Sequence, residues 1–289
     1  MAIIRNKTID RRLSSADLFC NMSASKAFRV IETYKNIRTS LLFTLSSGHD
    51  NSFVVTSAEP NSGKSVTSAN LALSFAQNGT RVLLIDCDMR NSSQQKIFEK
   101  ENNAGLSDVL AGMKPFGDAV KRDVKENLDL LTAGPTPPNP SELLGSERMR
   151  QLLEELRPQY EFIIMDSPPA GFVSDTLSLL LNAPQSIIIA RQNHAVYNEV
   201  AKTVELIKGV GGQVLGAILT DVKEQHKSYG YTYHAYRYRG DRYRSHYRRS
   251  DRPGYGYGYG YGYGYGAKKS SGEKKNAAPE KASEGKKRK

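Results

Sequence analysis

From Ser52 onward the chain alternates short apolar runs with stretches of helical periodicity. The apolar runs are SFVVTSA, RVLLIDCD, LDLLTAG, EFIIMDSPP, SIIIAR and QVLGAILTDV, and we expect helices near 63–78, 146–157, 175–182 and 195–209. Strands that are apolar at almost every position are buried on both faces, as in a parallel sheet between two layers of helices. The pattern predicts a doubly wound α/β fold with a mostly parallel sheet, whose ligands bind beyond the carboxyl ends of the strands.

The two ends of the chain differ from this core. Residues 24–45 carry apolar side chains three and four positions apart, which predicts an amphipathic helix with Phe28, Ile31, Tyr34, Ile37, Leu41 and Leu42 on one face. The last sixty or so residues are rich in Tyr, Gly, Arg and Lys, and this composition cannot bury enough apolar surface to offset its ordering entropy. We therefore expect an N-terminal segment with one helix (1–50), an α/β domain (51–225) and a disordered tail (226–289).

The net charge of +11 belongs entirely to the tail. Residues 229–289 hold 16 Lys and Arg against 5 Asp and Glu, which is +11, and the remaining 25 basic and 25 acidic residues cancel. No apolar run approaches the roughly 18–20 residues of a membrane-spanning helix, and the first residues lack the apolar core of a signal peptide, so we expect a cytosolic protein. Cys20 and Cys87 lack metal-ligand spacing, and we expect both to be reduced, with Cys87 buried.

A phosphate-binding loop of the P-loop NTPase type follows the first strand. The residues expected to surround the phosphates of a nucleotide are Pro60, Asn61, Ser62, Gly63, Lys64 and Ser65. Such a loop offers backbone N–H groups and a helix N-terminus to the phosphates, a lysine that neutralises them, and a hydroxyl that can ligate Mg²⁺. One departure is Ala58, which stands where the general pattern has its first glycine.

Three aspartates end two of the later apolar runs. Asp86 and Asp88 lie two residues apart, so in an extended chain both face the same side, and Asp166 ends the run FIIMD. An isolated aspartate at a strand end is as often a helix cap or a turn residue. Three of them beside a phosphate loop instead favour a metal site and a proton acceptor.

These motifs, in this order, resemble those of the bacterial tyrosine kinases (BY-kinases) of capsular and extracellular polysaccharide synthesis. Asn70 and the segment GPTPPNPSELL add to the resemblance, which covers roughly residues 24–225. It implies that ATP and Mg²⁺ are the cofactors, that Lys64 is catalytic, and that Asp86 takes the proton from the tyrosine hydroxyl. It also implies that Asp88 and Asp166 hold Mg²⁺ together with Ser65.

The resemblance further implies a ring-like, phosphorylation-sensitive homo-oligomer. Glu32, Lys35 and Arg38 occupy the family's E-x-x-R-x-x-R oligomerisation motif, with lysine in place of the middle arginine. The alternative for these three residues is a solvated polar helix face. A further departure is Thr220, where relatives carry an asparagine near the adenine. Because the chain has no membrane segment of its own, the resemblance implies a membrane-anchored activator of the polysaccharide-chain-length-regulator type, which recruits it to the inner face of the membrane.

Thirteen of the sixteen tyrosines lie in the tail, and we expect them to be the phosphoacceptors: Tyr229, Tyr231, Tyr233, Tyr236, Tyr238, Tyr243, Tyr247, Tyr255, Tyr257, Tyr259, Tyr261, Tyr263 and Tyr265. Basic and aromatic residues together are also typical of single-stranded RNA binding. The kinase motifs favour phosphate acceptance, and we expect no nucleic-acid partner.

The leading hypothesis is a tyrosine kinase that phosphorylates its own tail in trans, acts on other protein tyrosines, and regulates polysaccharide synthesis or export. One alternative is a partitioning-type ATPase switch whose basic tail binds nucleic acid or membrane. Against it, the early loop position where such ATPases carry a lysine holds Glu59 or Pro60. A third hypothesis is a scaffold whose nucleotide only controls assembly.

Overall fold

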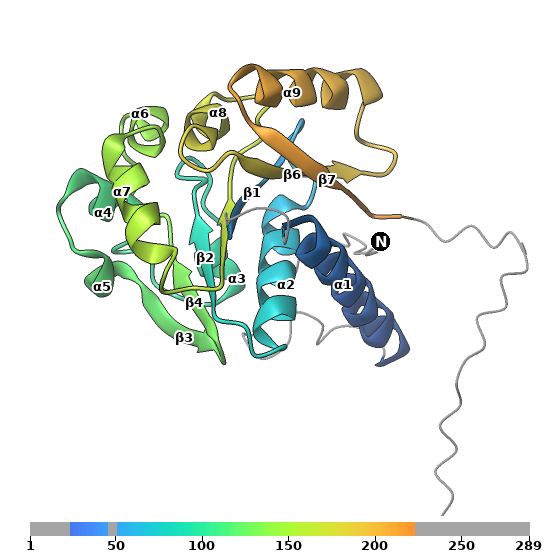
Figure 1. Ribbon diagram of the computed structural model, residues 1–289, viewed down its shortest axis with the longest axis horizontal. Helices are drawn as coiled ribbons and strands as arrows, with labels where there is room; N and C mark the ends of the chain where they lie inside the picture. Colours follow the sequence, from blue (N-terminus) through green and yellow to red (C-terminus); the bar gives the residue numbers. More distant parts are fainter. Residues whose placement is uncertain (1–23, 46–50, 223–289) are drawn as a thin grey trace, which may run out of the picture. The chain divides into compact units, whose positions relative to one another are not determined.

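The computed structural model describes residues 24–45 and 51–222 (Figure 1). Within them the chain forms one seven-stranded sheet in the order β3-β4-β2-β5-β1-β6-β7. The strands are β1 Ser52–Ser57, β2 Val82–Asp86, β3 Lys121–Lys125, β4 Leu128–Leu131, β5 Phe162–Asp166, β6 Gln185–Arg191 and β7 Gln213–Thr220. Every pairing is parallel except that of β3 with β4. The predicted mostly parallel, doubly wound sheet is confirmed.

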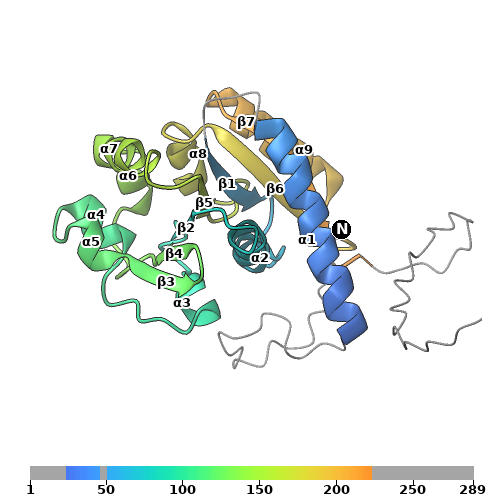
Figure 2. The same ribbon diagram turned by 60° about the horizontal axis from the view of Figure 1, so that its bottom comes forward.

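Helices cover both faces of the sheet (Figures 1 and 2). They are α1 Ala24–Leu45, α2 Lys64–Ala76, α3 Gln94–Ile97, α4 Leu106–Ala111, α5 Phe116–Ala119, α6 Pro140–Leu144, α7 Glu147–Leu156, α8 Asp175–Leu180 and α9 Tyr197–Gly209. Residues of α1, α2 and α3 contribute to one hydrophobic cluster, and residues of α4 to α9 contribute to the other.

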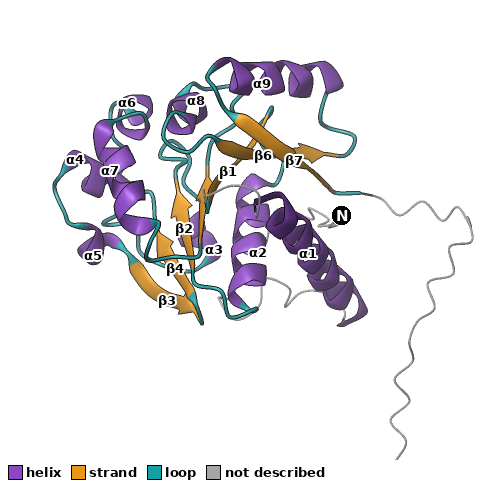
Figure 3. Cartoon of the chain, in the orientation of Figure 1, coloured by secondary structure: helices purple, strands orange, loops and turns teal. Residues whose placement is uncertain are grey.

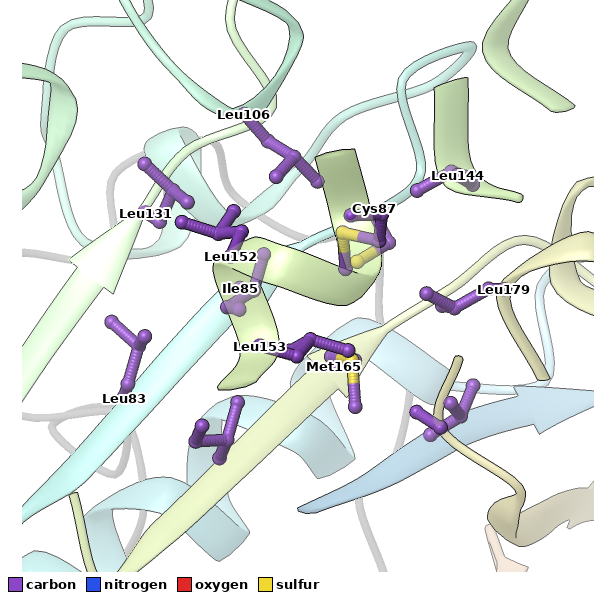
Figure 4. Close-up of a cluster of buried hydrophobic side chains, with 14 of the residues drawn as sticks. Leu83, Ile85, Cys87, Leu106, Leu131, Leu144, Leu152, Leu153, Met165 and Leu179 are labelled. Atoms are coloured by element: carbon purple, nitrogen blue, oxygen red, sulfur yellow. The ribbon is translucent and has the colours of Figure 1, made fainter. Parts of the chain in front are cut away.

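Alternate strand residues enter opposite clusters, which explains the unbroken apolar runs. In β2, Leu83 and Ile85 join the cluster under α7, whereas Val82 and Leu84 join the cluster under α2. Figure 4 shows the first cluster, where Leu83, Ile85 and Met165 of the sheet lie against leucines of α7. Cys87 lies in the same cluster as a buried free thiol, as predicted.

Helix α1 has the predicted bounds, and its buried face overlaps only in part with the predicted apolar face. Phe28 is 64% exposed and Leu42 is 38% exposed, whereas Val30, Tyr34, Leu41 and Leu45 are buried. The buried positions are those that face α2, beside which α1 lies in Figure 3. Phe28 and Leu42 therefore lie off the buried face, because spacing alone did not identify which of two overlapping apolar stripes meets α2.

Two kinds of element were absent from the sequence-based prediction. Strand β3 is a polar edge strand that pairs only with β4, so it lacks an apolar run. Helices α3 to α6 are four to six residues long, which is too short for a helical period to show. Among the helices of the described residues, none combines the length and the apolar character needed to span a bilayer.

Candidate active site at the carboxyl ends of β1, β2 and β5

The predicted phosphate loop connects β1 to α2. Asn61 and Gly63 have φ values of 58° and 87°, and Gly63 is the residue immediately before α2. The hydroxyl of Ser62 donates to the Glu59 carbonyl at 2.7 Å, and that of Ser57 donates to the same carbonyl at 2.6 Å. The loop thus curls around its own hydrogen bonds and presents the N-terminus of a 13-residue helix, whose first N–H groups have no intrahelical partner.

Thr220, at the end of β7, forms a hydrogen bond with this loop. Its Oγ1 donates to the carbonyl oxygen of Ser62 at 2.8 Å, across 158 positions of the chain. The sequence singled out Thr220 only as a departure near the expected adenine site. The structure shows that its hydroxyl holds the phosphate loop.

The carboxylate of Glu59 contacts two residues that precede α9. Its Oε1 accepts a hydrogen bond from the backbone N–H of Val196 at 3.2 Å, and its Oε2 lies 3.5 Å from Nε2 of His194. Both partners precede α9. Glu59, one of the two residues at which a partitioning ATPase would carry its lysine, thus connects the loop to the segment before α9 of its own chain.

The aspartates converge because β2 and β5 are neighbours. Asp86 and Asp166 are register partners, and both are fully buried. Oδ2 of Asp86 accepts the backbone N–H groups of Ser93 and Gln94, each at 3.0 Å. Its Oδ1 accepts the N–H of Asp88 at 3.1 Å, so three amides orient the Asp86 carboxylate.

Burial dominates the electrostatics of the site. It raises the pKa of Asp166 to about 6, although hydrogen bonds from Gln94 and Ser65 and the charge of Lys64 act in the opposite direction. The pKa of Asp86 is raised well above its ordinary value by burial and by the nearby Asp166. Burial lowers the pKa of Lys64, against the attraction of Asp166 and Asp88. One buried ammonium thus faces several carboxylates, and a further cation is favoured there.

The oxygen donors of the site suit Mg²⁺, which binds few protein ligands, more than a metal ion that requires a complete set of protein ligands. Among the described residues, no three His, Cys, Asp or Glu side chains are grouped closely enough to ligate an ion by themselves. Mg²⁺ usually takes one or two carboxylates and completes its shell with phosphate oxygens and water. Ser65 and Asp166 are hydrogen-bonded, and the charge of Asp88 affects the pKa of both Lys64 and Asp166.

Known proteins share this arrangement of sequence and fold. Residues 55–214 match the family model described as an AAA domain. The tyrosine-protein kinase YwqD of Bacillus subtilis is 39% identical over 201 residues, which cover 69% of this chain and 85% of YwqD. CapB of Staphylococcus aureus is 37% identical over 205 residues, which cover 71% of this chain and 90% of CapB.

The chain belongs to the bacterial tyrosine kinases. The solved kinase domain of Escherichia coli tyrosine kinase ETK agrees, with a TM-score of 0.65 and 36% identity over 70% of this chain and 80% of that domain. The family resemblance drawn from the motifs is confirmed.

Two sets of polar contacts near this kinase site were not predicted from the sequence. Gln94 binds both aspartate strands, since its backbone N–H reaches Asp86 and its Nε2 donates to Asp166 at 2.7 Å. Arg90 forms a bidentate ion pair with the buried Asp175 of α8, with N···O distances of 2.7 and 2.9 Å. Arg90 stands within the DCDMR motif, but no local pattern marks Gln94 or Asp175.

The remaining predicted residues lie apart from this bacterial tyrosine kinase site. On α1, Nζ of Lys35 is 2.8 Å from Oε1 of Glu32, and Arg38 donates to the carbonyl of Ser74 on α2. These contacts are internal to the chain and leave the oligomerisation prediction untested. The thirteen tail tyrosines lie outside the described residues.

Proposed function

We propose that this kinase transfers the γ-phosphate of Mg-ATP to tyrosine hydroxyls, above all those of residues 226–289 in a neighbouring copy. The observation that carries the proposal is that Lys64 interacts with Asp166 and Asp88 beside the phosphate loop, while Asp86 is the buried register partner of Asp166. Phosphoryl transfer needs bound phosphates, compensating positive charge and a correctly placed nucleophile more than it needs covalent chemistry by the protein. The residues at this edge of the sheet supply these requirements.

The phosphate loop and the metal ligands have separate tasks. The backbone of residues 60–65 binds the β- and γ-phosphates, and the Lys64 ammonium neutralises their oxygens. Ser65, Asp88 and Asp166 would hold Mg²⁺, an ion that usually binds one or two carboxylates together with phosphate oxygens and water. When bound, Mg²⁺ supplies positive charge against the charge that develops on the transferring group. Thr220 and Glu59 keep the loop in place.

Asp86 accepts the proton of the tyrosine hydroxyl. A raised pKa makes its carboxylate more basic than an ordinary aspartate, which suits a general base. The three amides that bind it favour the ionised form and fix the direction of its oxygens. Proton acceptance and metal binding are thereby assigned to different aspartates.

The thirteen tail tyrosines are the principal substrates, and other protein tyrosines are further ones. The tail alternates tyrosine with glycine over residues 254–266 and with arginine before that, so many hydroxyls follow one another in the chain. Transfer between copies requires an oligomer, for which Glu32, Lys35 and Arg38 are the proposed contact.

A membrane-anchored activator of the polysaccharide-chain-length-regulator type recruits the kinase to the inner face of the membrane. Support comes from the family, whose members carry a membrane segment or use that of a separate protein. The process controlled is the synthesis or export of a capsular or extracellular polysaccharide. The alternative of a partitioning-type switch is weakened by Glu59, which binds within its own chain.

The decisive experiment incubates dephosphorylated full-length protein with Mg-ATP and maps phosphotyrosine by mass spectrometry. Phosphate should accumulate on the tail. Lys64→Met should reduce the rate by about 100-fold or more, because it removes a positive charge that stabilises the transition state. The circular-dichroism spectrum of this variant should remain that of the folded protein. ATP hydrolysis without any phosphotyrosine would instead support the ATPase switch.

A further inference from the structure

The described residues contain three tyrosines, and they differ sharply in exposure. Tyr34 and Tyr160 are 2% and 3% exposed, whereas Tyr197 is 83% exposed. Since the other thirteen tyrosines all belong to the tail, Tyr197 is the solvent-accessible tyrosine of the described core. A kinase that acts on other copies of itself therefore meets this hydroxyl as well as those of the tail.

The two buried tyrosines have structural roles that exclude them as acceptors. The hydroxyl of Tyr160 donates to Oδ2 of Asp129 at 2.6 Å, and burial raises its pKa. Tyr34 packs in the hydrophobic cluster between α1 and α2. Phosphorylating either one would require local unfolding, because a phosphate dianion cannot be accommodated in those interiors.

The backbone around Tyr197 can present it to an active site. Tyr197 is the first residue of α9, and Val196 before it is extended, with φ −91° and ψ 124°. Of the seven side chains at positions 193–199, all but that of Ala195 are exposed. The first N–H groups of a helix have no intrahelical partner, so releasing this turn costs few hydrogen bonds. An extended segment centred on Tyr197 therefore requires little rearrangement.

Tyr197 also lies at the catalytic edge of the molecule. The N–H of its neighbour Val196 binds Glu59 of the phosphate loop at 3.2 Å. Acceptor and phosphate loop thus share one surface region. Two copies that present this region to each other in a symmetric contact would each bring Tyr197 toward the partner's nucleotide.

We propose that Tyr197 is a phosphoacceptor of the folded core, modified in trans and independently of the tail. The inference rests on the proposed kinase function. The phenolic oxygen bonds to the γ-phosphorus, the bond from that phosphorus to the β,γ-bridging oxygen breaks, and ADP leaves. The phenolic proton passes to the Asp86 carboxylate of the acting copy. The product is a phosphotyrosine next to the phosphate loop.

The test uses full-length proteins with separate enzyme and substrate roles. The enzyme is the Tyr197→Phe variant, so that any phosphate found at position 197 belongs to the substrate. The substrates are uniformly labelled with ¹⁵N, so that phosphate on the tail, Tyr34 or Tyr160 is also assigned to the enzyme or to the substrate by peptide mass. The first substrate carries Lys64→Met with its natural tail. The second carries Lys64→Met with all thirteen tail tyrosines changed to Phe, and the third adds Tyr197→Phe to the second. Phosphate is mapped on the tryptic peptide 192–202, which contains no other tyrosine.

The second substrate should gain phosphate on peptide 192–202, and the third should lose the signal completely. Phosphate on the tail of the first substrate, with none on the second, would overturn the inference while leaving the kinase function intact. Phosphate on Tyr34 or Tyr160 of the second substrate, without Tyr197, would also overturn it. If the first substrate gains no phosphate at all, the proposed transfer between copies is wrong.

Discussion

Asp86 and Asp166 are register partners on neighbouring parallel strands, and Gln94 binds both through its backbone N–H and its side-chain amide. Both carboxylates are buried, and the charge of Asp166 raises the pKa of Asp86. Their different hydrogen bonds separate them: Asp86 is held by three backbone amides, and Asp166 by side chains that include Ser68 of α2. This asymmetry supports the proposed division between Asp86 as proton acceptor and Asp166 as metal ligand.

Replacing Asp86 by Asn should separate chemistry from binding. The variant keeps the size of the side chain but cannot take a proton, so tyrosine phosphorylation should fall by roughly 10²- to 10⁴-fold. Mg-ATP affinity, measured by calorimetric titration, should remain close to that of the wild type. Asp88→Asn is the matched control and should lose affinity for Mg-ATP. Equal losses of binding and rate in Asp86→Asn would make Asp86 a metal ligand.

Without nucleotide and Mg²⁺, Asp166 should make the folded protein less stable as the pH rises from about 4 to about 6. The pKa of Asp166 is about 6 in the folded protein, against about 3.9 in an unfolded chain, so the folded state binds more protons in this window. The free energy of unfolding then decreases by at most about 3 kcal/mol for this group. The raised pKa of Asp86 acts in the same direction.

Thermal unfolding of Asp166→Asn checks this pH effect. The variant should unfold at a higher temperature than the wild type above pH 6, and the difference should shrink toward pH 4. Asp118→Asn, which changes an exposed aspartate, should follow the wild type at every pH. If the wild type were more stable than Asp166→Asn at pH 7, the prediction would be contradicted.

Thr220→Val should weaken ATP binding by loosening the phosphate loop. The substitution keeps the shape of the side chain and removes its hydrogen bond to the Ser62 carbonyl. A net loss of about 1 kcal/mol corresponds to about fivefold weaker binding. Thr132→Val removes a comparable 3.1 Å bond to the Ala104 carbonyl away from the loop, so it should lower stability without lowering affinity. Similar ATP affinities for both variants would show that the Thr220 hydroxyl does not support ATP binding.

Changing Glu32, Lys35 and Arg38 together to Ala should reduce the particle mass measured by light scattering, together with phosphorylation in trans. Because Arg38 also binds Ser74 within the chain, the double change of Glu32 and Lys35 tests the contact with less effect on folding. Arg38→Ala alone serves as the control for lost α1–α2 packing. An unchanged mass in both the triple and the double variant would exclude this surface as the oligomer contact.

Phosphorylation of the tail should reverse its charge and release it from acidic partners. Each phosphotyrosine adds about −1.5 to −2 charges, so roughly six or seven would cancel the +11 of residues 229–289. High salt should have the same effect by screening the attraction. Particle mass is compared for unmodified, fully phosphorylated and high-salt samples. If neither treatment changes it, the tail is a substrate or docking site only.

Local sequence patterns were sufficient to predict most of the regular structure and the main motifs. Unbroken apolar runs marked every strand except β3, and the 3.6-residue period gave α1 its observed bounds. The phosphate loop and the strand-end aspartates were recognisable because a turn, a helix start and a strand end each depend on a few consecutive residues. Convergence of Asp86 and Asp166 followed from the rule that parallel strands end at one edge.

The contacts that support the site were decided by the tertiary structure alone. Gln94 meets Asp166 across 72 positions, Arg90 meets Asp175 across 85, and Thr220 meets Ser62 across 158. Such bonds depend on the strand order, which puts β5 between β2 and β1, and no local pattern encodes that order. The same holds for Tyr197 and Phe28, because exposure depends on what the rest of the chain packs against. The sequence by itself determined which helices and strands form and at which edge of the sheet the site residues lie. Packing between distant segments decided which side chains hold those site residues in place.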